Sequence, residues 1–132
     1  MATGNKITND GLKLSLNRTY KVSPDYSAPS VFSIGTGTTT PLITDTDVES
    51  IVNINGGATK TFVTGYPTLD ETNLQATIRC LLATTEGNGN NLTEFGIFNT
   101  DGTPLMFMHA VHVSITKTTS VQVSYVSKDK YA

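Results

Sequence analysis

Two histidines have the clearest capacity for chemistry in this 132-residue chain. His109 and His112 stand three positions apart in Met-His-Ala-Val-His-Val, a spacing that would place two metal ligands on one face of a helix. The residues around them alternate as in a strand, where positions i and i+3 point to opposite faces. We therefore expect one core histidine and one surface histidine rather than a metal site. Neither has an evident Ser or Cys partner for nucleophilic catalysis.

Two further segments carry groups that bind ions in other proteins. Residues 45–49 (Asp-Thr-Asp-Val-Glu) alternate carboxylates, which suit a hard cation, but they lack the Gly and the bidentate Glu of a twelve-residue calcium loop. We expect a capped, solvated turn there, with one helical turn as the less favoured version.

Residues 35–40 (Gly-Thr-Gly-Thr-Thr-Thr) are glycine-rich but lack the Gly-Lys-Ser/Thr ending of a phosphate-binding loop. A plain turn is expected.

The other reactive groups give no support for an enzyme. Cys80 lies on the apolar face of a predicted strand, without a cationic neighbour that would lower its pKa, so we predict a core residue. As the only cysteine, it excludes an intramolecular disulfide. Asp70, Glu71 and Glu94 form no pair typical of glycoside hydrolysis, and Gly-x-Ser-x-Gly is absent. We predict no catalytic residue, metal ligand or cofactor; a small hydrolase is the alternative that substrate turnover would establish.

The elements that must position these groups are predicted to be β-strands. Residues 91–117 indicate a long hairpin, in which two runs of aromatic, aliphatic and β-branched residues flank a tight turn at 99–102 (Asn-Thr-Asp-Gly). Period-2 alternation and turn residues predict further strands at 12–16, 31–34, 51–54, 60–64, 74–82 and 121–125, with 51–54 and 60–64 joined as a hairpin.

These elements predict an all-β fold of about eight mostly antiparallel strands without a long helix. We expect a single-domain β-sandwich over residues 11–132, with a jelly roll as its most specific version. Residues 1–10 show no periodicity and are predicted to form a flexible arm. Residues 86–91 (Glu-Gly-Asn-Gly-Asn-Asn) are predicted to form an exposed, flexible loop.

Charge and hydropathy argue against nucleic-acid binding and against a membrane span. Charged residues make up 15% of the chain, the net charge is −2 and the basic residues are scattered, which disfavours nucleic-acid binding. No apolar run approaches the ~20 residues that span a bilayer, and the amino terminus lacks the apolar region of a signal peptide. We therefore expect a soluble protein made in the cytoplasm.

Two segments combine glycine, threonine and acidic residues in a distinctive order. Residues 32–41 (Phe-Ser-Ile-Gly-Thr-Gly-Thr-Thr-Thr-Pro) and 44–48 (Thr-Asp-Thr-Asp-Val) resemble the "IGTGTTxP…TDTxLE" stretch of small virion proteins of tailed bacteriophages. Residues 92–102 (Leu-Thr-Glu-Phe-Gly-Ile-Phe-Asn-Thr-Asp-Gly) resemble the "ITExGLFdxdG" hairpin found there and in baseplate-proximal domains of phage tail-fibre proteins. Residues 113–117 (Val-Ser-Ile-Thr-Lys) are similar to their "F-x-x-I-x-K" ending.

This resemblance implies a non-enzymatic structural protein of the virion, made in the host cytoplasm. Its expected place is capsid decoration or tail or fibre attachment, and its expected partners are phage capsid or tail proteins. We also expect a homo-oligomer, with a trimer favoured, in which repeated copies raise the effective affinity. The alternative is a receptor- or carbohydrate-binding module at a tail or fibre tip, where Tyr20, Tyr26 and Tyr66 would stack on sugar rings.

The hairpin supplies most of the candidate assembly contacts. Alternation through 105–115 predicts a core face with Phe107 and His109 and an opposite face with Met106, Met108, Ala110 and His112 that is unusually apolar. A symmetry mate or a second layer of the same chain would cover that face. The candidate contacts are Phe95, Gly96, Met106 and Met108 from the hairpin and Asn88 and Asn90 from the preceding loop.

Overall fold

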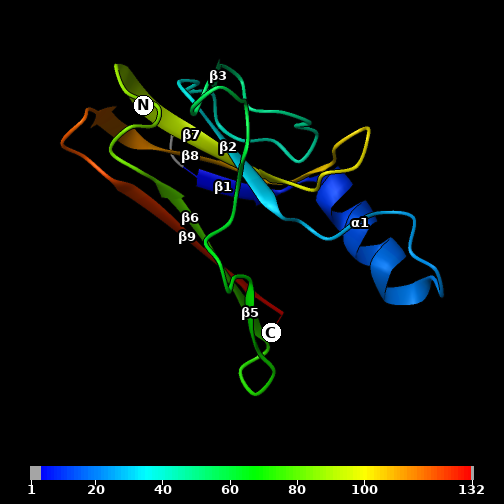
Figure 1. Ribbon diagram of the computed structural model, residues 1–132. Helices are drawn as coiled ribbons and strands as arrows, with labels where there is room; N and C mark the ends of the chain where they lie inside the picture. The colour runs from blue at the N-terminus through cyan, green and yellow to red at the C-terminus, as the bar shows by residue number, and fades with distance from the viewer. Residues whose placement is uncertain (1–3, 132) are drawn as a thin grey trace.

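The computed structural model describes residues 4–131 and contains two antiparallel sheets packed face to face (Figure 1). The six-stranded sheet is ordered β1-β8-β7-β2-β3, with β4 pairing β2 on the same edge as β3. Its strands are β1 (Gly4–Ile7), β2 (Val31–Gly35), β3 (Ile51–Val52), β4 (Lys60–Thr61), β7 (Asn90–Phe98) and β8 (Met106–Lys117). The three-stranded sheet is ordered β5-β6-β9 and consists of β5 (Thr68–Asp70), β6 (Gln75–Leu82) and β9 (Val123–Lys130).

The predicted all-β sandwich is confirmed, and its main core lies between the two sheets. Alternate residues of β6 enter that core, so Cys80 is 1% exposed and is a core residue as predicted. The facing sheet contributes large apolar side chains from β2, β7 and β8, among them Phe32, Ile34, Ile97 and Met108. Six strands against three differ from the eight strands and two Greek keys of a jelly roll.

The first predicted strand is wrong, because residues 9–20 form helix α1 (Asn9–Tyr20). Thr8 is its N-cap: the Thr8 hydroxyl accepts a hydrogen bond from the Gly11 N–H at 3.0 Å and donates one to the Met106 carbonyl. Of the alternating Leu12, Leu14 and Leu16, only Leu14 is buried. The cap and the docking on β8 therefore override the period-2 pattern. No helix within residues 4–131 is long and apolar enough to cross a membrane.

The predicted amino-terminal arm is also corrected. Gly4–Ile7 form β1, which pairs antiparallel with β8 in the register Gly4↔Val111 to Ile7↔Met108, and Asn9 and Asp10 begin α1. The arm predicted over residues 1–10 is thus part of the sheet and helix from residue 4 onwards. Residues 1–3 lie outside the described part of the chain.

The long β7–β8 hairpin is confirmed, but its turn is wider than predicted and spans residues 99–105. Phe98 pairs with Met106 and Ile97 pairs with Met108, so Phe107 lies in a bulge that shifts the alternation. Met108 and Ala110 therefore face the core between the sheets, and His109 lies on the opposite face beside Gly96. The predicted assignment of His109 to the core face with Phe107 is wrong.

The hairpin predicted from 51–54 and 60–64 is wrong in its pairing. β3 and β4 both pair with β2, at Ile34↔Val52 and Val31↔Thr61. The turn around Gly56 and Gly57 therefore leads the chain from one end of the β2 edge to the other.

Candidate functional site

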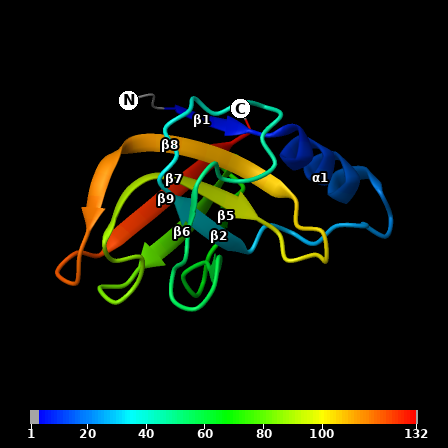
Figure 2. The ribbon, with the colours of Figure 1, turned by 90° about the horizontal axis from the view of Figure 1, so that it is seen from above.

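The outer face of the six-stranded sheet is covered by the segment that follows β2. Residues 36–50 cross over β7 and β8 (Figure 2), and Val48 packs in a second apolar cluster with Val31, Phe98 and Met106. The sequence left two alternatives for covering this face, a symmetry mate or a second layer of the same chain. The structure shows the second alternative. The same segment brings Asp45 to β8, where the candidate site lies.

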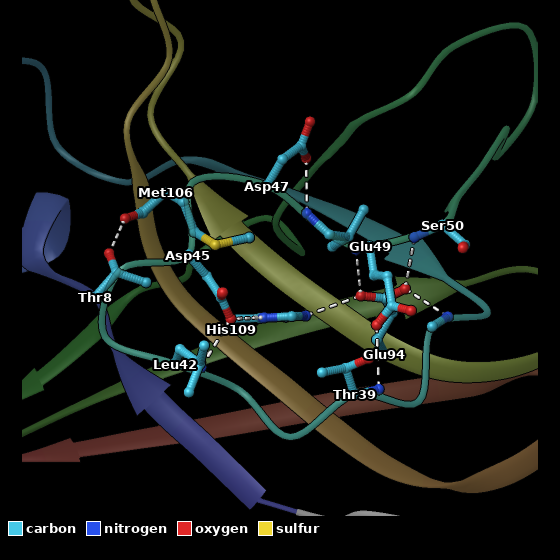
Figure 3. Close-up of polar contacts among 12 residues, drawn as sticks. Thr8, Thr39, Leu42, Asp45, Asp47, Glu49, Ser50, Glu94, Met106 and His109 are labelled. Atoms are coloured by element: carbon cyan, nitrogen blue, oxygen red, sulfur yellow. Dashed lines mark hydrogen bonds and ion pairs between the residues drawn. The ribbon is translucent and has the colours of Figure 1, made fainter.

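Glu94 is the centre of the site, and it is fully buried on β7. Its carboxylate accepts hydrogen bonds from three backbone N–H groups of the covering segment: Gly37 at 2.5 Å, Glu49 at 2.8 Å and Ser50 at 2.9 Å. It also contacts Nε2 of His109 at 2.8 Å (Figure 3). Four polar partners therefore compensate the desolvation of this charge.

His109 bridges two carboxylates. Its Nδ1 lies 2.7 Å from Oδ2 of Asp45, and the same Asp45 oxygen accepts the Leu42 N–H at 2.8 Å. The His109 side chain is 4% exposed, and both of its ring nitrogens are occupied (Figure 3). We call Asp45, Glu94 and His109 the buried clamp, because they tie residues 37–50 to the hairpin.

Electrostatics favour the charged forms of Glu94 and His109. Burial raises the pKa of Glu94. Hydrogen bonds from His109 and the three backbone N–H donors lower it by more than burial raises it, and the pKa falls from 4.5 to about 2. Burial lowers the pKa of His109, but hydrogen bonds and charge from Glu94 and Asp45 outweigh burial and raise it. An imidazolium between two carboxylates is the state that these contacts favour.

Glycines allow the covering segment to approach this closely. A Cβ on Gly35 would come within 2.6 Å of Oε2 of Glu94, and one on Gly37 would collide with the same atom. Residues 35–40 were predicted to form a plain turn that does not bind phosphate. Their backbone does bind an anion, and that anion is the carboxylate of Glu94.

The chemistry of the clamp is that of an internal ion-pair network. General base catalysis by histidine needs one ring nitrogen facing a nucleophile or substrate, and both nitrogens of His109 face carboxylates. Residues 4–131 contain no group of three or more His, Cys, Asp or Glu arranged to hold a metal ion. The arrangement therefore supports fixing of the covering segment.

The four candidate contacts from the hairpin lie inside the chain. Phe95 is 8% exposed and stacks on Tyr125 in the core, with ring centroids 4.3 Å apart. Met106 is 0% exposed and belongs to the second apolar cluster on the outer face, which we call the outer cluster. Met108 is 3% exposed and belongs to the main core. A Cβ on Gly96 would meet Met106, Phe98 and Val48 within 2.8–3.2 Å. The close approach expected at Gly96 is thus made by side chains of the same chain.

The 86–91 loop is held by polar contacts rather than being loosely exposed. Oδ1 of Asn88 accepts a hydrogen bond from Nζ of the buried Lys117 at 2.8 Å, and Nδ2 of Asn88 donates to the Thr84 carbonyl. Asn90 donates to the carbonyls of Gly87 and Asn88. Both candidate asparagines therefore have internal partners.

The remaining aromatic and histidine candidates do not share a site. His112 is half-buried and its Nε2 lies 3.0 Å from the Tyr125 hydroxyl. Tyr66 packs against the main core and Tyr26 lies beneath Nζ of Lys13, whereas Tyr20 is 80% exposed. The expected sugar-stacking tyrosines thus have three different environments.

Sequence reasoning missed the clamp because its members come from distant segments. In the sequence, Glu94 is a carboxylate without a paired neighbour, and Asp45 is part of an acidic turn. One signal was present: Glu94 interrupts the strongly apolar run Leu-Thr-Glu-Phe-Gly-Ile-Phe, and a histidine occurs on the second strand of the same hairpin. A charge in such a strand needs a buried partner.

Comparison of the chain with protein-family models, curated proteins and solved structures gives no match.

Proposed function

We propose that this chain is a non-enzymatic structural protein of a bacteriophage virion. It assembles on the particle surface, as capsid decoration or in tail or fibre attachment, through multivalent protein–protein contacts. Each copy contributes modest contacts to phage capsid or tail proteins and to further copies of itself, and repetition raises the effective affinity.

One observation carries the assembly part of this proposal: an exposed apolar stripe along α1, which starts beside the hollow that Leu12 lines. Leu12, Leu16 and Tyr20 follow one another at four-residue intervals and are 57%, 63% and 80% exposed. Side chains at this spacing lie on one helix face. Figure 1 shows α1 projecting beyond the sheets. A contiguous apolar stripe on a projecting helix is typical of a protein-binding surface.

The clamp supports the bacteriophage part of the proposal. The two segments that resemble virion proteins are far apart in the sequence, yet the Gly37 N–H of the first donates a hydrogen bond to the Glu94 carboxylate of the second. The resemblance therefore involves residues that act as one structural unit.

Quantitative mass spectrometry of purified virions from the phage that encodes the chain tests the proposal. We expect the protein in the particles, with hundreds of copies for capsid decoration or a dozen or fewer for tail or fibre attachment. Leu16→Lys should lower its copy number, whereas Lys13→Ser on the same helix should not. Detection of the protein in infected cells but not in particles would overturn the proposal.

A further inference from the structure

A groove separates the open edges of the two sheets. β1 pairs only with β8, and β9 pairs only with β6, among the residues that the structure describes. Both edges line one hollow of about 410 Å³, through residues 5–7 of β1 and 128–130 of β9.

The groove continues beneath α1 toward β5 and β6. A second hollow of about 340 Å³ shares Ser15, Phe107, Asp129 and Tyr131 with the first. Apolar side chains line much of the combined groove, among them Ile7, Leu12, Leu14, Leu69, Ile78 and Met108. Leu69 and Tyr131 are 73% and 75% exposed, so this apolar surface is open to a partner.

The charges around the groove are mainly positive. Lys6, Arg18, Lys128 and Lys130 line it, four of the nine Lys and Arg residues, against one of the eleven Asp and Glu residues, Asp129. The Tyr26 carbonyl accepts a 2.7 Å hydrogen bond from Arg18 and so fixes its guanidinium. A chain with net charge −2 therefore presents a locally cationic groove.

We propose that this groove binds an extended, acidic segment of a partner protein, which adds as a strand to the edge of β9. An edge strand presents unpaired backbone N–H and C=O groups, and the eight residues of β9 offer the longer of the two edges. Alternate apolar side chains of the segment pack on the groove floor, and its acidic side chains lie beside Lys128 and Lys130.

The charges favour this occupant over a second copy of the chain. Antiparallel pairing of two β9 edges at the residues that line the groove, 128–130, would place Lys128 of one copy opposite Lys130 of the other, and pairing of β9 with β1 would add Lys6. Like charges opposite one another destabilise a strand pair. The groove therefore selects a chemically different segment.

Asp129 supports a peptide backbone as the occupant. This half-buried carboxylate lies where the two hollows meet and accepts a hydrogen bond from the Ser127 hydroxyl at 3.2 Å. Burial raises the pKa of Asp129, although the Ser127 hydrogen bond partly opposes this. A backbone N–H donor from an added strand would stabilise the ionised form.

An NMR titration of the isotope-labelled full chain tests the inference. The probe is a synthetic nine-residue peptide with blocked ends in which Glu and Val alternate, and the comparison peptide has Lys in place of Glu. We expect the acidic peptide to shift and protect the amides of residues 4–7 and 123–131. Lys128→Glu combined with Lys130→Glu should weaken binding by about tenfold.

A charge-matched variant is the control. Lys13→Glu with Lys21→Glu changes the net charge by the same amount, and neither residue lines the groove. Retained binding by this variant supports the proposal, and the spectra establish that each variant is folded. Three outcomes would overturn it: no shifts at millimolar peptide, equal binding of the basic peptide, or equal weakening by the two double variants.

The inference names the partner of the proposed attachment function, and the two can fail separately. Absence of the chain from virions would remove the proposed function and leave peptide binding in the groove intact. Virions that contain the chain, together with a groove that binds no acidic peptide, would remove only the groove as the attachment surface.

Discussion

Glu94 shows how one charged residue organises a large part of this molecule. It lies in a strand of otherwise apolar character, where an unpaired carboxylate would be strongly destabilising. Three backbone N–H groups and His109 satisfy it instead, and the three backbone contacts fix the covering segment over the second apolar cluster. Removal of this one charge should therefore loosen residues 37–50 without altering the main core.

Glu94→Gln should destabilise the protein by about 3 to 5 kcal/mol, the usual effect of removing one partner from a buried ion pair. The amide keeps the shape of the side chain but leaves the His109 charge with Asp45 alone. Chemical denaturation of the variant provides the free energy of unfolding. Glu71→Gln, at an exposed position, is the matched control and should change little. Equal stability of the two variants would contradict a stabilising clamp.

The pKa values of the clamp define a pH window for its stability. The pKa of Glu94 is lowered from 4.5 to about 2, so its contribution is present above pH 4.5 and is lost as the pH falls from 4.5 toward 2. The pKa of His109 is raised above 6.5, so its contribution is complete below pH 6.5 and is lost as the pH rises through the raised value. The clamp contributes most between these limits.

His109→Gln should reduce the loss of stability on the alkaline side of this window. Chemical denaturation at about pH 5.5 and about pH 8.5 measures that loss as a difference in the free energy of unfolding. His112→Gln keeps the clamp and should retain the loss seen in the unchanged protein. A His109→Gln variant with the same alkaline loss would assign that loss to other groups.

At the scale of elements, α1 and the hairpin depend on each other. Thr8 joins the helix cap to Met106, and Gly11 lies against the carbonyl of Phe107 at the bulge of β8. The helix thus forms where its amino end meets the irregular part of the strand. Its apolar stripe is left exposed because only one side of the helix reaches the sheet.

Gly11→Ala should destabilise the protein, although the same change in an exposed helix stabilises by up to about 1 kcal/mol. The reason is steric: an added Cβ collides with the Phe107 carbonyl, which belongs to backbone that cannot rotate away. Thermal unfolding measures the effect. Thr19→Ala, at an exposed position of the same helix, is the control and should raise stability slightly. A higher melting temperature for Gly11→Ala would show that α1 docks differently.

At the scale of the molecule, both faces of the six-stranded sheet are covered by the chain itself. The three-stranded sheet covers one face, and residues 36–50 with the outer cluster cover the other. The surplus apolar face of the hairpin therefore no longer requires a symmetry mate. The apolar surface left over lies on α1 and in the groove, and both are places for assembly.

We expect the isolated chain to form a stable oligomer at micromolar concentration, because the α1 stripe exposes three large apolar side chains to solvent. A trimer is the favoured oligomer, as the resemblance to virion proteins implies. Light scattering combined with size-exclusion chromatography measures the mass. Leu16→Lys with Tyr20→Lys should shift the oligomer to monomer, and Lys13→Ser should not. A clean monomer of the unchanged chain would remove the homo-oligomer from the proposal.

The sequence by itself determined the all-β class, the long hairpin, β2, β6 and the core position of Cys80. These features depend on local alternation and on turn residues, which a single segment carries with it.

The tertiary structure alone decided the helical state of residues 9–20, the pairing of β3 and β4 with β2, and the face on which His109 lies. A cap contact to Met106, a shared strand edge and a one-residue bulge decide these features, and each involves residues that are distant in the sequence or hidden from its periodicity. The buried clamp belongs to the same class: its residue types were visible, but only folding brings Asp45, Glu94 and His109 within hydrogen-bonding distance.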